Sequence, residues 1–129
     1  MSDPISDVKA LITAQLRANC EPVPPKTSTS NQVHLSVWLT RGKRRPIGVE
    51  LDHKTVVNMW VWASEAPANI PGGVKTTRKA WAGGKWASPD GKGANSNLRG
   101  YEGFHGHDLI RLGVKTQADA DEILTHLLT

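Results

Sequence analysis

Three consecutive segments decide the fold: QVHLSVWLT at residues 32–40, IGVELD at 47–52 and VVNMWVWA at 56–63. In each segment aliphatic residues alternate with other residues at a period of two, which is typical of a β-strand. Short polar connections, RGKRRP (41–46) and DHKT (52–55), separate the segments. Connections this short join neighbouring strands of opposite direction, so the sequence predicts an antiparallel meander.

The side chains between the aliphatic ones are unusual for a solvent-facing side of a sheet. If the aliphatic residues of the three strands share one face, then Trp38, Trp60 and Trp62 fall together on the other face. One interpretation is that a terminal helix or a later loop covers these indoles. The other is that they form an aromatic platform for a ligand. The sequence leaves both interpretations open.

An amphipathic helix is predicted over residues 3–19, with Asp3 as its cap, Pro4 in its first turn and Asn19 at its end. Its apolar residues recur at helical spacing: Ile5, Val8, Leu11, Ile12 and Leu16. The segment that follows, EPVPPKTSTSN (21–31), has little to bury, and we expect it to be a mobile linker.

The C-terminal part of the chain predicts one more strand and one more helix. DLIRLGV (108–114) has the periodicity of a strand. The apolar residues of 117–128 recur at helical spacing, and Thr116 with Asp119 resembles a capping box at its start. The expected fold is a single α+β domain over residues 1–129, with a mostly antiparallel sheet of about four to six strands and a helix at each end.

Residues 64–104 are poor in aliphatic residues and rich in Gly, Pro and Asn, which predicts an irregular segment that contains some local order. The clearest order is in KAWAGGKWAS (79–88), which has one tryptophan on each side of Gly83-Gly84. This is the pattern of a β-hairpin with a two-residue turn. In that register Trp81 stands directly opposite Trp86.

Positive charge is concentrated in two stretches of the chain. The whole chain carries a net charge of +4, yet residues 41–45 alone contain four basic side chains. Residues 75–99 contain six basic side chains and one acidic one, a net charge of +5. The two stretches together carry +9, so the rest of the chain carries −5. Such segregation is expected of a surface that binds an anionic partner.

The leading hypothesis is therefore a module that binds DNA or RNA. Basic side chains would contact phosphates, Trp81 or Trp86 would stack on a base, and asparagines would read base edges. The candidate binding residues are Arg41, Lys43, Arg44, Arg45, Lys75, Arg78, Lys79, Trp81, Lys85, Trp86, Lys92, Asn95, Asn97 and Arg99. The competing interpretation is that the two indoles only brace the hairpin and that the lysines serve solubility.

Two other functions remain open. A protein-interaction or inhibitor module would dock an acidic partner on the basic loop or on the tryptophan-bearing face. A small nuclease or toxin-like hydrolase would use His105 or His107 as a general base. These histidines also have a spacing compatible with metal ligation, for which His34, His53 and Asp108 are the candidates for a third ligand. Without a second clustered pair, a surface or phosphate-contacting role is favoured, and we expect no metal or other cofactor.

Several other chemistries gain little support. The stretch ELDHK (50–54) contains the acid-x-Lys element of some metal-dependent nucleases, but no acid lies at residues 22–49, and a solvated turn is favoured. Gly91-Lys92-Gly93 does not match the phosphate-loop pattern GxxxxGK[ST]. No apolar run approaches the roughly 18 residues of a membrane span, and the N-terminus lacks a secretory pattern. We therefore expect a cytoplasmic protein.

Overall fold

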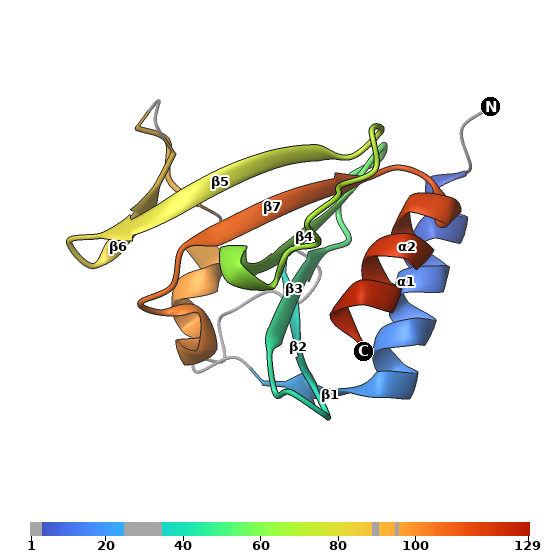
Figure 1. The fold of residues 1–129 in the computed structure, drawn as a ribbon, viewed down its shortest axis with the longest axis horizontal. Coiled ribbons are helices and arrows are strands. Elements are labelled where there is room, and N and C mark those ends of the chain that lie inside the picture. Colours follow the sequence, from blue (N-terminus) through green and yellow to red (C-terminus); the bar gives the residue numbers. More distant parts are fainter. Residues whose placement is uncertain (1–3, 25–34, 89–90, 95) are drawn as a thin grey trace.

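The computed structural model describes residues 4–24, 35–88, 91–94 and 96–129 (Figure 1). In chain order the helices and strands of this part are α1 (Ile5–Asn19), β1 (Cys20–Val23), β2 (Ser36–Thr40), β3 (Pro46–Glu50), β4 (Val57–Trp62), β5 (Lys75–Ala82), β6 (Lys85–Ala87), β7 (Leu109–Val114) and α2 (Gln117–Leu127). Short 3-10 helices lie between strands: η1 (Ala63–Glu65), η2 (Ser96–Gly100) and η3 (Glu102–Phe104).

The strands form one antiparallel sheet in the order β1-β2-β3-β4-β7-β5-β6. The last strand, β7, lies between β4 and β5, so residues near the C-terminus complete the middle of the sheet (Figure 1). The α+β class, the antiparallel sheet and the two terminal helices are confirmed. Within the described residues the sheet has seven strands rather than four to six.

Both helices lie on the same face of the sheet and pack against each other (Figure 1). Val8, Ile12 and Leu16 of α1 and Ile123 and Leu124 of α2 are fully buried there. They contact the aliphatic residues of β3, β4 and β7 that alternate toward the helices. The apolar stripes read from the sequence thus meet the aliphatic face of the sheet, and their burial is the main stabilising contribution of this layer.

The helix ends follow local signals in the sequence. Thr116 caps α2, since its Oγ1 accepts a hydrogen bond from the backbone N–H of Asp119 at 3.1 Å, as predicted. Helix α1 begins directly after Pro4 and ends at Asn19, while the predicted cap Asp3 lies outside the described residues. Neither of the described helices has the length and apolar content that spanning a membrane requires.

A second hydrophobic cluster lies on the opposite face of the sheet. Leu98, Tyr101 and Phe104, from the segment around η2 and η3, pack against Val37 and Trp60. Trp60 is only 1% exposed. A later loop therefore covers this indole, which is the first of the two interpretations of the tryptophan-bearing face.

The prediction that Trp38 shares a face with Trp60 and Trp62 is wrong. Trp38 pairs with Ile47 and packs against the cluster beneath the helices. Val37 of the same strand points to the opposite face, toward η2 and η3. Because each face of this strand packs against a hydrophobic cluster, the alternation of aliphatic residues does not reveal which set faces the helices.

Two strands lie where the sequence predicted irregular structure. Residues 21–23 of the predicted linker belong to β1, which pairs with β2, whereas residues 25–31 lie outside the described part of the chain. Pro22 is compatible with pairing because β1 is an edge strand. Residues 75–79 of the predicted irregular segment extend the hairpin arm into a longer strand that pairs with β7.

The predicted hairpin is confirmed. Trp81 pairs with Trp86, and the centroids of their rings lie 4.7 Å apart in an edge-to-face arrangement. Gly83 and Gly84 have φ values of 62° and 78°. Positive φ at both central positions is what a type I′ turn requires, and such a turn matches the twist of the two strands.

Replacing Gly83 with valine should destabilise the hairpin, because a β-branched residue disfavours positive φ. We expect Gly83→Val to lower the free energy of unfolding by about 1–2 kcal/mol, measured by chemical denaturation. Gly83→Asn should lower it less, since asparagine tolerates this conformation.

The matched control is Gly42→Val in the exposed turn between β2 and β3. A Cβ at Gly42 has no neighbour within 4 Å, and its φ is not positive. Equal losses of stability for Gly42→Val and Gly83→Val would contradict the assigned role of the turn.

Candidate functional site

The segment of η2 and η3 covers only part of the second face of the sheet. It leaves part of β7 and β5 uncovered. Antiparallel pairing places Lys75 opposite Gly113 and Thr77 opposite Arg111. Directly paired residues share a face, and Lys79 follows two residues further along the same face. The Arg111 guanidinium donates a hydrogen bond to Thr77 Oγ1 at 3.3 Å, which links the two strands through their side chains.

These side chains line an open trough, called the basic trough below. One part of it has a volume of about 640 Å³, and an adjoining part of about 290 Å³ shares Lys75 and Arg111 with the first. Its cationic residues are Lys75, Lys79, Lys92, Arg111 and Lys115. None of the described residues that line it is acidic. Collected positive charge without acidic neighbours in the lining favours an anionic ligand.

Two of these cations are held in place by the protein itself. Lys79 is only 4% exposed, and its Nζ donates to the backbone carbonyl of Lys92 at 3.3 Å. The guanidinium carbon of Arg111 lies 5.8 Å from the centre of the Trp60 ring, within the range of a cation–π interaction. Because these side chains are already ordered, an anion that binds here loses less free energy to their immobilisation.

The floor of the trough includes the backbone of Gly113. A Cβ at this position would lie 3.4 Å from Val56 Cγ2 and 3.5 Å from the Lys75 carbonyl oxygen. Gly113 is buried near the C-terminal end of β7 and lines the trough with backbone alone.

The structure brings Lys75, Lys79 and Lys92 of the predicted binding residues together in the trough. It adds Arg111 and Lys115, which the sequence prediction omitted. A signal for Arg111 was present in DLIRLGV, where it alternates with aliphatic residues on a strand that is otherwise apolar. A charged residue at such a position indicates that one face of the strand reaches solvent or a ligand.

The basic loop at residues 41–45 lies away from the trough, at the turn between β2 and β3 (Figure 1). Arg41 and Lys43 are exposed and lie beside the C-terminal ends of α1 and α2. Arg44 and Arg45 form ion pairs with acidic residues of β1 and η1, at 3.9 Å and 3.1 Å. Part of this positive charge is thus compensated within the protein.

The remaining predicted polar residues lie on other elements or outside the described residues. Lys85 is exposed next to the tip of the hairpin, and Arg99 is exposed on η2. Asn97 belongs to η2, and Asn95 lies outside the described residues. None of the described residues of this group is among those that line the basic trough.

The indoles around the hairpin are engaged by other rings and by backbone. Trp86 is 4% exposed, and its indole N–H donates to the His107 carbonyl at 2.8 Å. Trp81 is half-buried, with its ring nearly parallel to that of His105 at 5.8 Å. The Trp62 and His107 rings stack at 3.8 Å. These contacts favour the interpretation that the indoles brace the hairpin.

His105 and His107 do not converge on one position, because each ring lies against a different indole. Nε2 of His105 donates to the Arg99 carbonyl oxygen at 2.9 Å, so this nitrogen carries its proton. Within the described part of the chain, the side chains grouped closely enough to share a metal ion are instead Glu50, Asp52 and His53.

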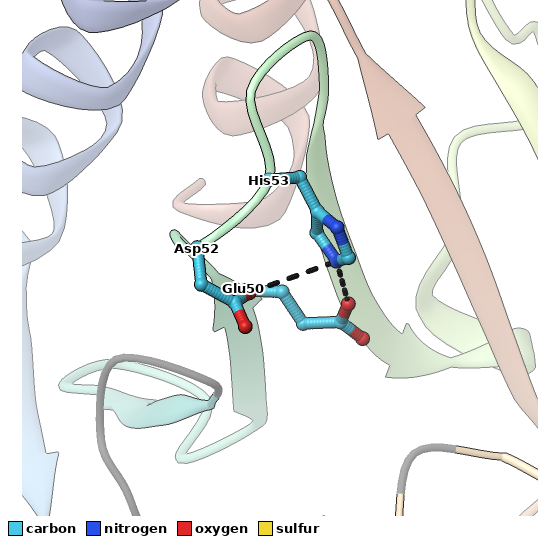
Figure 2. A group of neighbouring side chains, drawn as sticks. All are labelled: Glu50, Asp52 and His53. Atoms are coloured by element: carbon cyan, nitrogen blue, oxygen red, sulfur yellow. Dashed lines mark hydrogen bonds and ion pairs between the residues drawn. The ribbon is translucent and has the colours of Figure 1, made fainter.

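That group lies at the end of β3, where His53 reaches back from the following loop toward Glu50 (Figure 2). Glu50 is 6% exposed. Its carboxylate accepts hydrogen bonds from His53 Nε2 at 2.6 Å, from Asn58 Nδ2 at 3.2 Å and from the Trp60 indole N–H. Asp52 lies 3.7 Å from His53 Nε2. The Glu50 carboxylate therefore links the loop, through His53, to β4, through Asn58 and Trp60. The prediction of a solvated turn is wrong for Glu50.

Hydrogen bonds to the Asp108 carboxylate link β5 of the hairpin to the residue before β7. Its Oδ1 accepts the backbone N–H of Trp81 at 2.9 Å, and its Oδ2 accepts Arg78 Nη2 at 3.0 Å. The predicted binding residue Arg78 is thus paired with an acid on the face opposite to Lys79. The bond from Trp81, followed by that from Arg78, holds the pKa of the Asp108 carboxyl below its usual range.

No family model matches the chain, and neither a curated protein nor a solved structure matches it. Function is therefore inferred from the charge and geometry of the basic trough.

Replacing Asp108 with asparagine should destabilise the protein at neutral pH. The folded-state pKa of Asp108 is lower than the unfolded value, so its contribution to stability is present above the unfolded value and is lost as pH falls through the folded one. The difference in Tm between the wild type and Asp108→Asn should therefore shrink as the pH is lowered below about 4. Thermal melts across this range provide the measurement.

Asp121→Asn on the exposed side of α2 is the matched control and should leave the melting profile nearly unchanged. A difference between the wild type and Asp108→Asn that stays constant down to low pH would show that the ionised carboxylate does not stabilise the hairpin.

Proposed function

We propose that this protein binds nucleic acid and that the basic trough is where the phosphates lie. The observation that carries the proposal is the row of cationic side chains along β5 and β7, with no acidic residue among the described residues of the lining. Lysine and arginine form charge-assisted hydrogen bonds with phosphate oxygens. Displacement of condensed counterions from the nucleic acid then supplies much of the binding free energy.

The length of the trough supports a polymer rather than a single small anion. Lys75 and Lys79 are four residues apart on one strand, which separates their Cα atoms by roughly 13 Å. Lys115 extends the lining beyond Lys75. The exposed Lys75 and Lys115 can contact phosphates directly, and the buried Lys79 extends the positive charge along the row. A row of this length matches several phosphates of one strand better than one small anion.

Polar groups that are not charged complete the site. The Thr77 hydroxyl and the Asn58 amide line the trough beside the cations. Hydroxyl and amide groups often contact phosphate and sugar oxygens and fix the register of a protein on a nucleic acid. An acidic protein would meet the same positive charges, and competition between nucleic acid and an acidic polypeptide distinguishes the two partners.

The hydrolase alternative finds less support than binding. Its proposed general bases, His105 and His107, are packed against indoles, and neither is among the described residues that line the trough. Incubation of labelled DNA and RNA with the protein and Mg²⁺ tests this alternative. Cleavage that is lost in His105→Ala or His107→Ala would favour it.

Removing positive charges from the basic trough should lower the affinity for nucleic acid and make that affinity less dependent on salt. We expect the double variant Lys75→Ala/Lys115→Ala to lose about tenfold or more in affinity for DNA or RNA at moderate salt. The slope of log affinity against log salt should fall by about 1 for each lysine removed. Both residues are exposed, so the fold should persist, and fluorescence anisotropy over a salt series gives both quantities.

The control is Arg41→Ala/Lys43→Ala, which removes the same charge from the turn beside the helix ends. Its affinity should stay within about twofold of the wild type, because charges more than a Debye length apart are largely screened. Equal weakening by the two double variants, or the absence of salt-sensitive binding by the wild type, would contradict the proposal.

A further inference from the structure

We infer that the basic trough takes the sugar-phosphate backbone of a double-stranded nucleic acid and that no tryptophan stacks on its bases. This inference rests on the proposed function and specifies its ligand. It reverses the role that the sequence assigned to Trp81 and Trp86.

The described lining of the trough offers no aromatic side chain on which a base could stack. Its described residues are basic, small or polar apart from Val56, and none of them is aromatic. Proteins that bind single strands typically combine a basic groove with aromatic side chains on which successive bases stack. The basic trough has the first of these elements and lacks the second.

The indoles on this side of the sheet are occupied within the fold. Trp60 is 1% exposed and lies beneath Arg111. Trp62 stacks on the His107 ring at 3.8 Å and has the Arg45 guanidinium carbon 4.9 Å from its centroid. The Trp62 indole N–H also donates to the Gly103 carbonyl at 2.9 Å, which fixes the orientation of the ring. A base that stacked on Trp62 would have to displace one of these partners.

The two tryptophans of the hairpin, Trp81 and Trp86, are no more accessible to a base than Trp60 and Trp62. Trp86 is buried, so a base has no access to its ring. Trp81 packs edge-to-face with Trp86 and lies nearly parallel to His105, and its backbone N–H is bonded to Asp108. The only ring of the pair that is half-exposed is therefore fixed by contacts on several sides.

The arrangement of the cations fits a regular backbone. Lys75, Thr77 and Lys79 point to one face of β5, and the two lysines, of which Lys79 is buried, are roughly 13 Å apart along the strand. Arg111 of the neighbouring strand lies in the same lining as Lys75 and is linked to Thr77 by a hydrogen bond. A double helix presents its phosphates outward in a regular row with its bases stacked inside, and it needs only contacts of this kind.

The test compares three ligands of equal length with the wild-type protein: an oligothymidylate, an abasic single strand with the same phosphates, and duplex DNA. We expect the two single strands to bind with affinities within about twofold of each other, because the bases contribute no stacking. The duplex should bind most tightly, and its salt slope should be the steepest, because its phosphate charge is the densest.

A thymidylate strand that binds about fivefold or more tightly than the abasic strand would overturn the inference, since stacking of even one base typically contributes about this much. A single strand that outcompetes the duplex would overturn it as well. In both cases the proposed function would stand. The proposed function itself fails only if none of the three ligands binds in a salt-sensitive manner, so the two failures are distinguishable.

Discussion

The second face of the sheet is divided between a hydrophobic cover and solvent, and the rest of the structure depends on this division. The two helices lie on one face, so the opposite face must find other cover or remain polar. Leu98, Tyr101 and Phe104 supply the cover over β2, β3 and β4. Beyond them β7 and β5 expose Lys75, Thr77 and Arg111, and the basic trough occupies the part that is left.

Two tryptophans hold the covering segment in place on the second face of the sheet. The indole N–H groups of Trp62 and Trp86 donate to the carbonyls of Gly103 and His107, so both hold the segment that covers the cluster. Buried tryptophan usually finds a partner for its N–H, and here the partners lie on a loop that has little other regular structure. The abundance of tryptophan therefore has a structural explanation, and it does not by itself indicate a surface for ligands.

Local signals were sufficient to predict several elements. Both helices were predicted from the spacing of their apolar residues and from the residues at their ends. The hairpin and its register were predicted from Gly83-Gly84. These features depend on residues close together in the chain, which is why a single sequence reveals them. The position of β7 between β4 and β5 depends on contacts between distant segments and was not predicted.

The candidate site was predicted only in part for the same reason. Lys75, Lys79 and Lys92 stood out because they belong to a basic stretch, but Arg111 joins them through pairing across about thirty residues of chain, which composition does not reveal. The predicted face of Trp38 was wrong because each face of β2 packs against a hydrophobic cluster. The basic loop at 41–45 was included on charge alone, and its position beside the helix ends follows from tertiary structure.

The central claim, that the basic trough is the surface that meets phosphates, is tested most directly by mapping the backbone amide chemical shifts of the protein during titration with duplex DNA. The largest changes should fall on residues 75–79, 92–93 and 111–115, which line the trough. Much smaller changes should occur at residues 41–45. Changes concentrated at 41–45 or at the hairpin tip, with the strands of the trough unaffected, would contradict the account.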